Sequence, residues 1–207
     1  ANGGVDEEDG DGVNIRSGMG FFRRAILDQH FLARGRIGRL LVSVLATDSL
    51  PLGLGIDENT ALVVDGDTAW VAGASGVVVV DGREARRTGS IRGSGIRVTL
   101  AGRGDVLDLR TFAVRHGAGK VAVPVSPEAT FQAPEDPFAR WAFLHLLVGL
   151  SSTSRRQALL STSGAVLGVT EGDGFTAVMS GPEGGVEGTP SGFSAGPFVL
   201  DLLAPGA

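Results

Sequence analysis

Residues 25–45 read AILDQHFLARGRIGRLLVSVL: an apolar start, the polar cluster Asp28-Gln29-His30, and then a stretch rich in arginine and aliphatic residues. From Arg36 onward the aliphatic residues recur at helical spacing, which predicts a helix of about three turns with one apolar face. Pro51 ends that unit. The apolar start predicts a short strand that carries the polar cluster at its C-terminal edge, where open α/β sheets place their sites. This strand–loop–helix unit indicates the α/β class.

Short β-rich runs follow the predicted helix and are separated by Gly or Asp-Gly turns, with Asp65-Gly66 and Asp81-Gly82 giving the clearest turn signals. Because these connections are short, we expect a partly antiparallel β extension on the helix-bearing α/β core. The runs are Ala61–Val64, Thr68–Val71, Val77–Val80, Ile96–Leu100 and Val106–Leu109.

The chain divides into three predicted parts. Residues 1–17 are acidic and glycine-rich, which predicts a flexible N-terminus without a signal peptide. Residues 18–119 form the predicted α/β domain. Residues 120–207 form a predicted C-terminal α+β appendage, with a helix from Asp136-Pro137 to about Leu150, a short helix around Arg155–Leu160 and a few weak strands.

Composition excludes several classes of function. The 207 residues suffice for a sizeable core, and their net charge of −5 argues against a nucleic-acid partner. No apolar run approaches the length of a membrane span, so no membrane partner is expected. Cysteine is absent and the three histidines show no metal-binding spacing, so we predict no metal and no cofactor. We expect a cytoplasmic protein, with a secreted form as the alternative.

The cluster that begins at Asp28 combines four kinds of polar group. His30 supplies a titratable base, Asp28 a carboxylate and Gln29 an amide, and three guanidiniums follow at Arg34, Arg36 and Arg39. Guanidiniums bind carboxylates in bidentate geometry, so the cluster suits an acidic or peptide-carboxylate ligand. The residues alone also fit a plain solvated surface with a satisfied histidine.

Two ordered motifs resemble signatures of cyanophycinases, serine peptidases related to dipeptidase E. Asp28-Gln29-His30-Phe31 with Arg34-Gly35-Arg36-Ile37-Gly38-Arg39-Leu40 resembles the first, and Gly55-Ile56-Asp57-Glu58-Asn59-Thr60-Ala61 resembles the second. The likeness covers about residues 18–110. It implies a three-layer α/β sandwich like that of class I glutamine amidotransferases. It also implies hydrolysis of cyanophycin, a polyaspartate with arginine in β-amide linkage, to β-Asp-Arg dipeptides.

The resemblance also implies roles for individual residues. His30 matches the catalytic base, and Glu58 matches the acid that orients it; a turn or cap role for Glu58 is the alternative. The substrate-pocket positions are matched by Asp28, Gln29, Arg34, Arg36 and Arg39. In such a site the imidazole takes the proton of the nucleophile, and the carboxylate fixes its tautomer.

The sequence departs from the family at the nucleophile. The family carries its serine on a Gly-Thr-Ser-Ala-Gly elbow before the Asp-Gln-His motif, whereas the only serine before Asp28 is Ser17, outside any strand–elbow–helix context. Gly192-Phe193-Ser194-Ala195-Gly196 fits Gly-x-Ser-x-Gly but lacks a preceding strand pattern, so we interpret it as a chance match, with a permuted nucleophile as the alternative.

We therefore expect a C-terminal chain whose partner, the N-terminal chain of the same precursor, carries the serine; the chain begins without Met, which fits prior processing. The substrate would be a peptide or cyanophycin-like polymer, and a homo-oligomer is expected. The alternatives are a non-catalytic binding or structural subunit, and a peptidase acting on another acidic dipeptide or isopeptide.

Overall fold

The computed structural model describes residues 19–47, 49–89, 91–162 and 164–205. The predicted flexible segment 1–17, including Ser17, lies outside them. The elements are β1 (Ile26–Gln29), α1 (Ile37–Ala46), β2 (Leu52–Ile56), β3 (Thr60–Asp65), β4 (Thr68–Gly73), β5 (Gly76–Asp81), β6 (Arg86–Arg87), β7 (Gly93–Gly102), β8 (Val106–Asp108), β9 (Val114–Arg115), β10 (Val121–Ala122), α2 (Ala142–Ser152), β11 (Gln157–Ser161), β12 (Val166–Met179), β13 (Gly181–Gly184), a 3₁₀ turn (Val186–Gly188), β14 (Pro190–Ser191) and β15 (Ser194–Leu203).

One large sheet organises the described residues. Its strands run in the order β1-β2-β5-β7-β15-β12-β10, with β11 paired to β12 and β6 to β7. Only β1 and β2 pair in parallel; the other pairs in this sheet are antiparallel. The predicted mixed α/β class with a partly antiparallel sheet is thus confirmed, and the antiparallel share is larger than expected.

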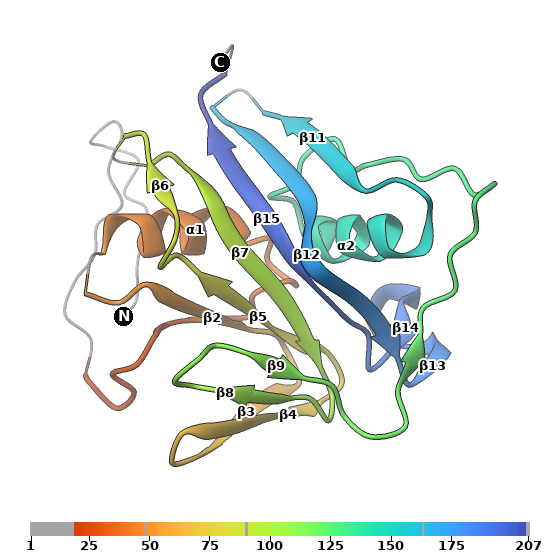
Figure 1. Cartoon of the computed structure of the whole chain (residues 1–207), viewed down its shortest axis with the longest axis horizontal. Helices are drawn as coiled ribbons and strands as arrows, with labels where there is room; N and C mark the ends of the chain where they lie inside the picture. The colour runs from red at the N-terminus through yellow and green to blue at the C-terminus, as the bar shows by residue number, and fades with distance from the viewer. Residues whose placement is uncertain (1–18, 48, 90, 163, 206–207) are drawn as a thin grey trace.

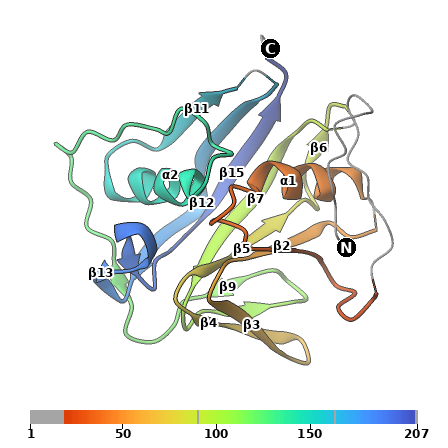
Figure 2. The ribbon, with the colours of Figure 1, turned by 180° about the vertical axis from the view of Figure 1, so that it is seen from behind.

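The valines of β5 show why the molecule has three layers. Val78 and Val80 point into a core shared with α1 and α2, whereas Val77 and Val79 point into a second core shared with the four-stranded sheet β3-β4-β8-β9. Successive strand residues face opposite sides of a sheet, so a continuous apolar run needs a cover on both. The helices lie on one face and the small sheet covers part of the other (Figures 1 and 2).

Helix α1 is confirmed where the spacing predicted it. Its aliphatic face is buried against β2, and two glycines of β2 make the close approach possible. A Cβ added at Gly53 would lie 2.8 Å from Val44, and one at Gly55 would lie 2.4 Å from the Phe31 ring. Alanine at either position would therefore push the helix, or the turn before it, off the sheet.

Residues 120–207 share the large sheet with the first part of the chain, because β15 pairs with β7 and also with the fourteen-residue strand β12. Core residues from both parts form one cluster. The division into two parts at residue 119 stays a prediction. The strands that the sequence indicated only weakly after Ser151 include β12 and β15, which are long strands inside the large sheet.

Two predicted helix positions are wrong. Residues 157–161 form strand β11, paired with β12 from Gln157↔Thr170 to Ser161↔Val166, rather than a helix. Helix α2 begins at Ala142; Asp136 instead begins a separate turn, in which its carboxylate accepts the Phe138 amide and its carbonyl accepts the Ala139 amide. Among the described residues, no helix has the length and apolar character to cross a bilayer.

Candidate functional site

The loop between β1 and α1 starts at His30, whose backbone takes the left-handed conformation with φ of 49°. The amide of Arg34 donates to the His30 carbonyl at 3.1 Å, and the amide of Arg36 donates to the Phe31 carbonyl at 3.0 Å. Phe31 is fully buried beside Gly55, so the turn is fixed to the sheet one residue after the histidine. His30 therefore stands at the C-terminal edge of β1, as predicted.

Asp57 fastens this loop to the loop between β2 and β3. One carboxylate oxygen accepts the Ala33 amide at 2.9 Å, and the other accepts the Ser75 hydroxyl at 2.6 Å. The carboxylate is buried, and buried carboxylates are costly unless they are hydrogen-bonded in this way. Asp57 is a residue that the sequence pattern did not mark as functional, although its place directly before Glu58 in the second motif was a signal.

The two loops bring His30 and Glu58 together. His30 Nδ1 lies 3.2 Å from Glu58 Oε1, and the two side chains are 45% and 38% exposed. The following residue, Asn59, is also left-handed, with φ of 51°, which turns the chain from β2 into β3. A carboxylate on Nδ1 favours the tautomer with its proton on that nitrogen, so the lone pair of Nε2 can accept a proton.

Asp28 holds two of the predicted substrate-binding arginines. Its carboxylate is buried and pairs with Arg39, whose Nε lies 2.6 Å from Oδ2, and with Arg36, whose Nη1 lies 3.3 Å from Oδ1. Arg36 Nη1 also donates to the Gln29 carbonyl at 2.6 Å. Asp28 is thus placed to position guanidiniums. Gln29 and Arg34 are exposed residues at the same edge of the large sheet.

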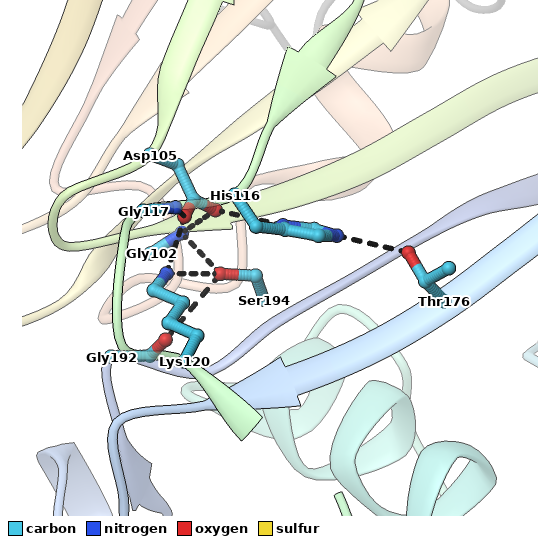
Figure 3. A network of polar contacts seen from close by, with 8 residues as sticks. All are labelled: Gly102, Asp105, His116, Gly117, Lys120, Thr176, Gly192 and Ser194. Carbon is cyan, nitrogen blue, oxygen red and sulfur yellow. Dashed lines mark hydrogen bonds and ion pairs between the residues drawn. The ribbon is translucent and has the colours of Figure 1, made fainter. Parts of the chain in front are cut away.

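Ser194 has different surroundings. It begins strand β15 instead of standing between a strand and a helix, and its hydroxyl is fully buried. The hydroxyl oxygen accepts the Gly102 amide at 3.1 Å and lies 2.6 Å from Lys120 Nζ (Figure 3). The geometry is not that of a nucleophile elbow, which exposes its serine at a sharp turn before a helix.

Lys120 and Asp105 form the centre of this buried network. Lys120 Nζ lies 2.5 Å from Asp105 Oδ1, and the two side chains are 2% and 0% exposed. Burial lowers the pKa of Lys120, while the hydrogen bond and charge of Asp105 act in the opposite direction. The network joins the end of β7, the segment before β10 and the start of β15 (Figure 3).

No family model matches the chain, but curated relatives do. A cyanophycinase from Synechococcus elongatus is 32% identical over 113 residues, which are 50% of this chain and 35% of the relative. A cyanophycinase from Trichormus variabilis is 41% identical over 78 residues, or 37% of this chain and 26% of the relative. One from Geminocystis herdmanii is 42% identical over 72 residues. The matched segments span about a third or less of these relatives, and over that part the chain is cyanophycinase-like.

Proposed function

We propose that this chain carries the base and the orienting acid of a cyanophycinase-like serine peptidase that releases β-Asp-Arg from an arginine-bearing polyaspartate or a related isopeptide. The observation that carries the proposal is the 3.2 Å contact between His30 Nδ1 and Glu58 Oε1 at the edge of the sheet. The nucleophilic serine comes from polypeptide outside residues 1–207.

In this proposal each residue has one task. His30 Nε2 takes the proton of the serine hydroxyl as the oxygen attacks the amide carbon, and then gives it to the leaving nitrogen. Glu58 stabilises the imidazolium formed between these steps. Arg34, Arg36 and Arg39 bind free carboxylates of the substrate, which in this polymer belong to its arginine residues and its chain end. Asp28 positions Arg36 and Arg39.

The large sheet offers a place for the segment with the serine. Strand β1 is the end strand of the sheet, and within the described residues it pairs only with β2, in parallel. A further strand added parallel to β1 would end close to His30, because parallel strands have their carboxyl ends at the same edge of a sheet. The unpaired groups of an edge strand favour such an addition.

The proposal is tested with the longest polypeptide that the gene encodes, purified from its native source. We expect it to release β-Asp-Arg from cyanophycin, detected by mass spectrometry, and to be labelled by a fluorophosphonate at one serine outside residues 1–207. Binding of the polymer without hydrolysis would instead support a non-catalytic binding subunit. Labelling of Ser194 would contradict the assignment of the nucleophile.

Asp28→Asn should weaken substrate binding more than catalysis in that enzyme. The amide removes the charge that holds Arg36 and Arg39, so we expect KM to rise about tenfold with a smaller change in kcat, and the free energy of unfolding to fall by about 1–3 kcal/mol. Initial-rate kinetics and urea denaturation measure both. Asp201→Asn, at a carboxylate that accepts a backbone amide on β7, is the control. A kcat loss at unchanged KM would assign Asp28 a different role.

A further inference from the structure

The outer face of the large sheet carries a pocket of about 350 Å³ beside the small sheet. Along β5 the residues on this face are Val77 and Val79 and then Asp81; along β7 the corresponding residues are Ala101, Thr99 and Arg97. The small sheet covers the apolar part of this face. The polar part continues beyond it as the pocket floor, which β12 and β15 extend.

Four charged side chains of Asp, Glu and Arg residues line the pocket. Two of them form an ion pair with each other, and the other two carry opposite charges and form no salt bridge within the described residues. Arg83 binds Asp81 through two nitrogens, donates to the Thr111 carbonyl at 2.9 Å, and lies 4.3 Å from the centre of the Phe112 ring. Arg97 and Glu84 also line the pocket, and both residues are exposed. Within the described ranges neither side chain forms a salt bridge, although the pKa of Arg83 is raised by its hydrogen bond to Asp81, by the charge of Asp81 and, to a smaller extent, by the charge of Glu84.

A third polar group is held in place by the buried network. His116 Nε2 lies 2.9 Å from Thr176 Oγ1, and both residues line the pocket. Its Nδ1 lies 3.5 Å from Asp105 Oδ2, so the ring is held between β12 and the carboxylate that also binds Lys120 (Figure 3). Both ring nitrogens are thus engaged, and the imidazole holds the threonine hydroxyl in place at the pocket wall.

We propose that this pocket binds a small zwitterion, an amino acid or dipeptide whose carboxylate pairs with Arg97 and whose cationic group pairs with Glu84. A guanidinium is suited to bind a carboxylate in bidentate geometry, and a pocket of this volume is at the lower end of the range for small-molecule sites. The hydroxyl of Thr176, which His116 holds in place, hydrogen-bonds a polar atom of the ligand. None of the residues assigned to the peptidase site lines this pocket, so the two sites are separate.

Calorimetric titration of the chain with arginine tests the proposal. Free arginine has a carboxylate and an ammonium group at one end and a guanidinium group at the other. We expect saturable binding that Arg97→Gln weakens about tenfold or more, while Arg155→Gln leaves it unchanged. Arg155 is also exposed but lies outside the pocket. Agmatine, which lacks the carboxylate, should bind the wild type as weakly as arginine binds Arg97→Gln.

Citrulline, with a neutral side chain of similar shape, tests Glu84. The wild type should prefer arginine to citrulline, and Glu84→Gln should remove that preference. Absence of arginine binding up to about 10 mM, or an equal effect of the Arg97 and Arg155 substitutions, would overturn the proposal. His30→Ala should bind arginine like the wild type; loss of binding there would place the ligand at the peptidase site instead. Failure of the peptidase proposal leaves this result unaffected.

Discussion

His30→Ala in the complete enzyme should lower kcat for β-Asp-Arg release by about 10³-fold or more, with little change in KM. The imidazole is proposed to move the proton of the nucleophile in both halves of the reaction, so its removal impairs both proton transfers. Steady-state kinetics on a soluble β-Asp-Arg polymer give both constants. The side chain is exposed, so stability should be unaffected.

His145→Ala is the matched control, because His145 is an exposed histidine on α2 with no assigned role. Glu58→Gln should retain a hydrogen bond to the ring but lose the charge that stabilises the imidazolium, so its kcat should fall between the wild type and His30→Ala. If the His30 and His145 variants have equal activity, the assignment of the base is wrong.

Lys120→Met should be the most destabilising single change in the C-terminal part of the chain. Its ammonium lies 2.5 Å from a fully buried carboxylate, and methionine would leave Asp105 without that cation, with two backbone amides and the ring of His116 as its remaining contacts. Breaking such a pair costs about 3–5 kcal/mol. Urea denaturation followed by circular dichroism measures the free energy of unfolding.

Arg156→Met is the control for Lys120→Met. Arg156 pairs with Glu171 at 2.7 Å, but its side chain is 81% exposed, so water screens the pair and the expected loss is below about 1 kcal/mol. Adding Asp105→Asn to Lys120→Met should recover part of the stability, because the buried charge is then absent. Equal losses for the Lys120 and Arg156 variants would show that the buried pair contributes no more than a surface one.

Local sequence pattern was sufficient for the elements near the N-terminal end of the described chain. The aliphatic spacing after Arg36 predicted α1, and Asp65-Gly66 predicted the turn between β3 and β4, because both depend on residues a few positions apart. The helix predicted around Arg155–Leu160 was wrong for the opposite reason. The local pattern of this segment permits a helix, but pairing with β12 made it a strand, and that pairing joins residues 5 to 13 positions apart.

The sequence by itself determined that Asp28, Gln29 and His30 lie at the end of a strand, followed by an arginine-bearing loop and helix. Only the tertiary structure decided what these groups contact. Glu58 faces His30 because Asp57 joins two loops 24 residues apart, and Asp28 binds Arg36 and Arg39 because the chain reverses between them. The same holds for Ser194, whose Gly-x-Ser-x-Gly motif we interpreted as a chance match. Its hydroxyl contacts Lys120, 74 residues earlier, and the Gly102 amide in the core. Spacing along the chain fixes local geometry, whereas burial and pairing depend on contacts that form only when distant segments pack together.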